Sequence, residues 1–107
     1  MDSAELKAIL DELKQRLSDL YGDRLVELVL YGSQARGDAD EGSDIDVLVV
    51  LSGAVNPCAE LRSAGDILYD ISYDNDTVVS CVFVPEAEFA RGEGPLIRNV
   101  HREGVRL

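Results

Sequence analysis

Apolar residues recur at helical spacing near the start of the chain, with charged residues between them. They follow Ser3, a suitable N-cap, and comprise Leu6, Ile9, Leu10, Leu13, Leu17 and Leu20. Gly22 comes next, and glycine commonly ends helices because it adopts positive φ without strain. The pattern predicts an amphipathic helix that ends near Tyr21 and places its leucines in the core.

Two apolar runs then read as strands. The first extends from about Arg24 to Tyr31, and the second from Ile45 to Leu51 is nearly all β-branched or leucine. That composition is typical of a strand covered on both faces. The segment 32–43 between them contains three glycines, and we expect it to be a loop.

The second half of the chain continues with alternating elements. Pro57 suits the first turn of a helix, and the predicted apolar stripe is Leu61, Ala64, Ile67 or Leu68, and Ile71. Further elements are expected as a strand over about 77–84, a short helix over 86–91, a helical turn over 96–102 and a short apolar end. The order helix-strand-strand-helix-strand-helix predicts one α/β or α+β domain with a small mixed sheet.

Composition narrows the function classes. A net charge of −11 argues against non-specific nucleic-acid binding and suits divalent cations or a basic protein partner. A chain of 107 residues buries only a modest core on folding, so we expect a stabilising partner or a homodimer. With two distant cysteines and only His101, no usual zinc site is expected. The charged N-terminus and the absence of a membrane-length apolar run favour a cytoplasmic protein.

Candidate chemistry lies at the start of the second apolar run. Residues two apart on a strand share a face, with Cα atoms roughly 6.5 to 7 Å apart. Asp44 and Asp46 would therefore point the same way, while Ile45 and Val47 enter the core. Two carboxylates held on one face repel each other, and a bound Mg²⁺ would remove that repulsion.

Two other interpretations of these acids exist. A solvent-exposed strand entrance explains the Asp44 and Asp46 spacing equally well, although Asp38, Asp40 and Glu41 add to the local acid density. A calcium loop starting at Asp38 fails, because its fifth position is Gly42 and its twelfth is Val49.

The Gly32-Ser33 pair precedes these acids by ten residues. It suits a simple turn, or a phosphate site in which backbone amides and the Ser33 hydroxyl donate to phosphate oxygens. Arg36 could neutralise phosphate or pair with neighbouring acids, and the sequence favours neither. His101 is expected to be a structural or surface residue.

Together, the motif Gly-Ser-x-Ala-Arg-Gly followed by Ser-Asp-x-Asp between apolar strands resembles the DNA polymerase β-like nucleotidyltransferase superfamily. The whole chain resembles its minimal, stand-alone MNT-type members. The resemblance implies a small mixed sheet flanked by helices, Mg²⁺ as cofactor and ATP as substrate. It implies nucleotide binding by Gly32, Ser33, Arg36 and Ser43, and metal binding by Asp44 and Asp46.

Many members of that superfamily carry a third acid on the next strand, and here TVVSCVFV contains none. Asp76, just before it, is the predicted catalytic replacement, with Asp74 behind it and Ser80 as a non-acidic alternative. The resemblance further implies AMP transfer to a hydroxyl of a HEPN-domain toxin. The alternatives are an inactive module that neutralises a partner by contact and a transferase acting on a small molecule.

Overall fold

The computed structural model describes residues 1–40 and 42–107. The strands are β1 (Leu25–Tyr31), β2 (Ile45–Leu51), β3 (Val79–Pro85) and β4 (Val105–Arg106). The helices are α1 (Ser3–Tyr21), α2 (Ser33–Arg36), α3 (Pro57–Asp74), α4 (Glu86–Arg91) and α5 (Pro95–Glu103), and a 3-10 turn, η1 (Gly22–Arg24), follows α1.

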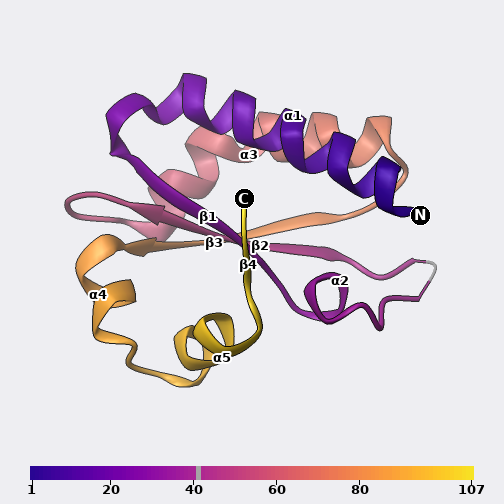
Figure 1. The fold of residues 1–107 in the computed structure, drawn as a ribbon. Helices are drawn as coiled ribbons and strands as arrows, with labels where there is room; N and C mark the ends of the chain where they lie inside the picture. The colour runs from indigo at the N-terminus through magenta and orange to yellow at the C-terminus, as the bar shows by residue number, and fades with distance from the viewer. Residues whose placement is uncertain (41) are drawn as a thin grey trace.

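The strands form one mixed sheet in the order β3-β2-β1-β4 (Figure 1). β1 is antiparallel to both β2 and β4, and β2 is parallel to β3 with α3 as the crossover. Helices α1 and α3 cover one face of the sheet, and α4 and α5 cover the other (Figure 1). The predicted small mixed sheet flanked by helices is confirmed.

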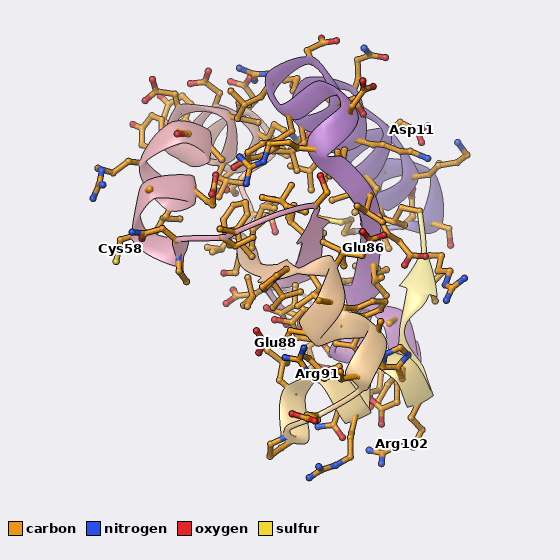
Figure 2. The ribbon with its side chains drawn as sticks, turned by 90° about the vertical axis from the view of Figure 1, so that its left-hand side faces the viewer. Asp11, Cys58, Glu86, Glu88, Arg91 and Arg102 are labelled. Atoms are coloured by element: carbon orange, nitrogen blue, oxygen red, sulfur yellow. The ribbon has the colours of Figure 1, made fainter. Side chains whose placement is uncertain are left out.

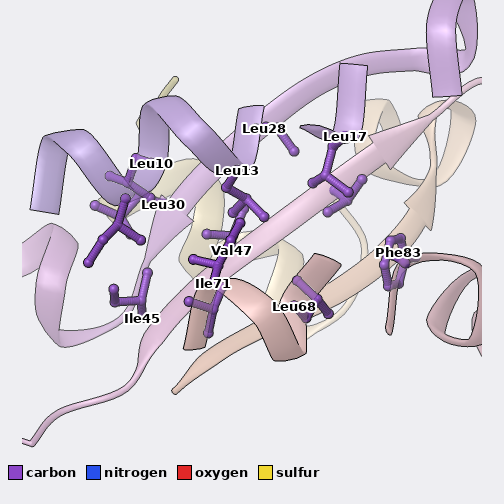
Figure 3. Close-up of a cluster of buried hydrophobic side chains, with 14 of the residues drawn as sticks. Leu10, Leu13, Leu17, Leu28, Leu30, Ile45, Val47, Leu68, Ile71 and Phe83 are labelled. Carbon is purple, nitrogen blue, oxygen red and sulfur yellow. The ribbon is translucent and has the colours of Figure 1, made fainter. Parts of the chain in front are cut away.

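The larger of two cores lies between the sheet and the α1/α3 layer (Figure 3). Alternate residues of β2 enter it, and all of them are fully buried: Ile45, Val47, Val49 and Leu51. They meet Leu10, Leu13 and Leu17 of α1, of which the last two have no exposed surface. The prediction was wrong for Leu20, which is 42% exposed at the end of the helix.

The smaller core lies between the sheet and the α4/α5 layer. It comprises Val29, Leu48, Val50, Val84, Phe89, Ile97 and Val100. Since Leu48 and Val50 of β2 belong to it, β2 is buried on both faces, as its composition predicted. The exposed Arg91 and Arg102 lie on the outer side of this layer (Figure 2).

Both long helices are capped by side chains, although not entirely as predicted. Asp2, rather than Ser3, caps α1, because its Oδ1 accepts a hydrogen bond from the Glu5 amide at 2.8 Å. Asn56 caps α3 directly before Pro57, which occupies the predicted first turn. No described helix is long and apolar enough to cross a membrane.

Two other predictions about the elements were wrong, and one strand was missed. Leu61 is 52% exposed, and Glu60 is buried in its place because Arg24 pairs with its carboxylate at 3.4 Å. The expected loop over 32–43 contains the short helix α2. The apolar chain end forms β4, whose Val105 pairs with Leu30; two residues are too few to show a strand period.

Candidate functional site

The start of β2 carries the two predicted carboxylates. Ile45 and Val47 lie in the larger core, as expected. Strand alternation therefore directs Asp46 to the opposite face, on the side of Leu48 and the smaller core. Leu48 is fully buried, whereas Asp46 is only partly buried and Asp44 is exposed. The apolar layer thus ends where the carboxylates begin.

The carboxylate of Asp46 lies directly against the glycine turn at the end of β1. A Cβ atom at Gly32 would be only 2.7 Å from Asp46 Oδ2. The backbone of Gly32 also has φ 73° and ψ −157°, a conformation that side chains oppose. The backbone favours glycine here, and an added Cβ would force the Asp46 carboxylate to move. The Gly-Ser turn and the Asp46 carboxylate therefore lie side by side.

Ser33 begins the four-residue helix α2 immediately after this turn. The Gly32 carbonyl accepts hydrogen bonds from the Ala35 and Arg36 amides, both at 3.1 Å, and the Gly37 amide closes the turn on the Ser33 carbonyl at 3.0 Å. The first amides of a helical turn have no partner within the helix and can donate to an anion. The turn is therefore able to offer donors beside a carboxylate.

Negative charge is concentrated at this position. Partial burial, followed by the nearby charge of Asp44, raises the pKa of Asp46. Tyr31 pairs with Asp46 across β1 and β2, and burial together with the Asp46 charge raises the pKa of its hydroxyl. The raised pKa of Asp46 means that its charged form is disfavoured here, and a cation beside the carboxylate would oppose that effect.

On β3, the residue beside Asp46 is Ser80. The two residues pair in the parallel register of β2 and β3, so their side chains share a face. β3 contains no acid. Over residues 1–40 and 42–107, no group of three or more His, Cys, Asp and Glu side chains is arranged to hold a metal ion.

Asp76 lies in the exposed turn between α3 and β3, with a positive φ of 49°. The parallel strands β2 and β3 begin at the same edge of the sheet, where the Ile45 amide donates to the Val78 carbonyl at 2.8 Å. Asp76 and Asp44 therefore both precede strands at that edge. A direct contact between Asp76 and Asp46 is not among the described interactions.

Ser43 and Asp76 line one hollow of about 280 Å³, together with Gln34 and Asp40. The Ser43 hydroxyl accepts a hydrogen bond from the Asp40 amide at 2.8 Å, so it holds the loop before β2. Asp44 and Asp46 do not line this hollow. Glu41, which contributed to the acid density in the sequence, lies outside the described residues.

Arg36 forms two ion pairs with acids. Its Nε is 3.1 Å from Asp38 Oδ2, and its guanidinium is 3.3 Å from Glu103 Oε2 at the end of α5. These hydrogen bonds, that to Asp38 first, raise the pKa of Arg36. Of the two interpretations left open, pairing with acids is therefore present in this structure. Its predicted contact with phosphate stays a prediction.

His101 has the structural role expected of it. Its ring stacks on Phe89 with centroids 4.4 Å apart, and its Nε2 lies 2.8 Å from the Phe89 carbonyl oxygen.

Sequence reasoning missed Tyr31 and Glu103. The position of Tyr31 could have been predicted from sequence. It directly precedes Gly32, and an antiparallel pairing of the two apolar runs brings it opposite Asp46. Glu103 is 67 residues from Arg36, and no local signal joins them.

The donor set suits Mg²⁺. This ion prefers oxygen ligands and often binds through one or two carboxylates completed by water and substrate phosphates. Asp44 and Asp46 supply the carboxylates, and the Gly32 position, which a Cβ would block, leaves the Asp46 oxygen accessible to the turn. The residues present therefore fit such an ion, with the rest of its coordination left to substrate and water.

The family model of the nucleotidyltransferase domain matches residues 10–107. The chain belongs to this family. A provisionally named protein adenylyltransferase of Methanocaldococcus jannaschii is 48% identical over 50 residues, which are 47% of this chain and 34% of that relative. The chain thus spans about a third of the length of this curated relative.

Solved structures share the fold. A toxin–antitoxin crystal structure with AMP-PNP superposes with a TM-score of 0.65 and 21% identity, over 90% of this chain and 69% of the other. A complex of a tri-AMPylated Shewanella oneidensis HEPN toxin with its MNT antitoxin has a TM-score of 0.52 and 15% identity, over 92% and 70%. At these identities the likeness concerns the fold alone.

Proposed function

We propose that this nucleotidyltransferase domain transfers AMP from ATP to a hydroxyl group of a partner protein in a Mg²⁺-dependent reaction. The observation that carries the proposal is the contact of the Asp46 carboxylate with the Gly32 turn, with Asp44 close enough to affect its pKa. A metal-binding group and a phosphate-binding group are thereby adjacent.

In this proposal the Gly32-Ser33 turn binds the triphosphate through backbone amides and the Ser33 hydroxyl, and Arg36 and Ser43 complete the nucleotide site. Asp44 and Asp46 hold Mg²⁺, which when bound offsets the negative charge of the phosphates. The acceptor hydroxyl forms a new bond to the α-phosphorus, and the bond to pyrophosphate breaks.

The acceptor hydroxyl must also lose its proton. We assign this role to Asp76, which precedes β3 at the same edge of the sheet as Asp44. Ser80 cannot act as a carboxylate base, although its position beside Asp46 is where an acid could be accommodated.

The proposed partner is a HEPN-domain toxin, which the chain would counteract as a cytoplasmic antitoxin. Support comes from the adenylyltransferase name of the archaeal relative and from the HEPN toxin–MNT antitoxin complex with the same fold. The net charge of −11 suits a basic partner.

The test is labelling of a purified HEPN-domain protein with labelled ATP, Mg²⁺ and this chain. The double variant Asp44→Asn/Asp46→Asn should abolish labelling. The control is Asp11→Asn/Asp19→Asn, which makes the same charge change at exposed positions of α1 and should label normally. Full labelling by the first variant would contradict the assigned site.

The absence of an acid from β3 favours one second candidate, a module that neutralises the toxin by contact alone. This candidate predicts that the Asp44→Asn/Asp46→Asn variant neutralises toxin activity fully. Loss of neutralisation together with labelling would exclude it.

A further inference from the structure

An apolar ridge lies exposed along α3. Its members are spaced four residues apart and therefore adjoin on the helix surface: Leu61, Gly65, Tyr69 and Tyr73. We call this set the α3 ridge. The side chains of Tyr69 and Tyr73 are 68% and 75% exposed, and their rings stack with centroids 6.1 Å apart. Two adjacent aromatic rings in water form an unusually apolar surface for a charged helix.

The ridge is not needed for the packing of α3 within the chain. The helix enters the larger core through Ala64, Leu68 and Ile71. It meets α1 on another side, where Asp70 pairs with Arg16 at 3.2 Å. Figure 1 shows these two helices side by side over one face of the sheet. The ridge lies outside both contacts.

Gly65 is the second indication of a partner. Glycine inside a helix costs up to about 1 kcal/mol relative to alanine. A Cβ atom at Gly65 would meet no other atom within 4 Å, so the packing of this chain does not require glycine. A small residue within a four-residue ridge allows a second helix to pack closely across it.

Charge indicates which partner fits. Helix α3 carries one basic residue, Arg62, against four acids: Glu60, Asp66, Asp70 and Asp74. Asp66 lies three residues before Tyr69, is exposed, and has no ion pair among the interactions of the described residues. A second copy of this chain would bring another −11 charge toward the same acids, which opposes self-association. A helix with basic residues beside an apolar strip would complement both the rings and the carboxylates.

We propose that the α3 ridge is the docking surface for a basic, apolar helix of the protein partner. The identity of that partner rests on the proposed function, whereas the ridge itself does not. Gly65 sets the distance of closest approach, and Tyr69 and Tyr73 supply the aromatic contact on which such interfaces commonly depend.

The experiment is calorimetric titration of the full chain with a purified HEPN-domain protein, without nucleotide. Tyr69→Ser/Tyr73→Ser should weaken binding at least tenfold, and Gly65→Leu should do the same by blocking close approach. The matched control is Leu96→Ser/Val105→Ser, which removes two other exposed apolar side chains and should change the affinity less than twofold.

The outcomes separate the two proposals. Unchanged affinity in both ridge variants would overturn the ridge and leave the proposed function standing. A wild-type chain that binds ATP with Mg²⁺ but not the HEPN protein would overturn the assigned partner. Concentration-dependent dimers that disappear in Tyr69→Ser/Tyr73→Ser would instead identify a second copy as the occupant and overturn the basic partner.

Discussion

The two neighbours of Asp46 in the sheet differ in what they contribute. On the β1 side the Asp46 carboxylate lies against Gly32, and Tyr31 is paired with it. On the β3 side the paired residue is Ser80, and the nearest preceding acid is Asp76 in an exposed turn. The groups that we propose for phosphate and metal thus include two that lie against each other, Gly32 and Asp46, whereas the group that we propose for proton removal lies in an exposed turn.

Gly32→Ala should cause the largest change on the β1 side. The added Cβ would collide with Asp46 Oδ2 and would strain a backbone at φ 73°. Displacing a catalytic carboxylate by about 1 Å can cost on the order of a hundredfold in rate, and we expect a loss of AMP transfer of that size. Initial rates of labelling measure it.

The control for this variant is Gly53→Ala. Gly53 has a similar φ of 76°, but no atom lies near its Cβ position. Gly53→Ala should lose about as much stability as Gly32→Ala, about 1 to 3 kcal/mol. Its rate of labelling should equal that of the wild type. Equal rates for the two variants would mean that the contact with Asp46 does not matter.

Asp76→Asn tests the β3 side. If Asp76 accepts the proton, its loss should slow labelling by roughly a hundredfold, as for other general bases, while ATP binding with Mg²⁺ is unchanged. Asp11→Asn is the control, since it removes a charge at an exposed position of α1. Labelling at the wild-type rate would remove Asp76 from the mechanism.

Ser80→Asp should partly restore the rate of labelling that Asp76→Asn loses. The register places a carboxylate at position 80 beside Asp46, so Asp76→Asn/Ser80→Asp should label about tenfold faster than Asp76→Asn alone. The uncharged Ser80→Asn in the same background should give no rescue. Equal rates for these two double variants would show that the β3 side cannot host the base.

The smallest expected effect is that of Asp46→Asn on the free energy of unfolding of the metal-free protein. Burial and Asp44 raise the pKa of Asp46 in the folded state, so the stability it contributes is present at low pH and is lost as the pH rises through that pKa. Replacing it should stabilise the fold at pH 7 by only about 0.5 kcal/mol, because solvent reaches the site.

Thermal unfolding at several pH values measures this effect. The gain in Tm should shrink as the pH falls, and Mg²⁺ should raise the Tm of the wild type more than that of the variant. A lower Tm for Asp46→Asn than for the wild type at pH 7 would contradict the conclusion that the Asp46 charge destabilises the metal-free fold.

Much of the fold could be predicted from sequence, because apolar periodicity determines which residues are buried. The strand from Ile45 to Leu51 and the helix from Glu86 to Arg91 were located to the residue. β4 was missed because Val105 and Arg106 become a strand only by pairing with β1, which is not a local property.

The same limit applies to the site. The approach of Asp46 to Gly32 could be predicted, since Gly32 directly follows the first apolar run and Asp46 lies at the start of the second. The pairing of Arg36 with Glu103 could not, because it depends on how α5 returns to the sheet. The position of Ser80 beside Asp46 required the register of β2 and β3, which the α3 crossover leaves undetermined in sequence.

The ion pair between Arg36 and Glu103 has a consequence for synthesis on the ribosome. It joins the turn that follows the first strand to the last helix, and that helix also covers the smaller core. A nascent chain could form its glycine turn early, but this ion pair can form only after Glu103 has left the exit tunnel. Assembly of the site is therefore tied to completion of the domain.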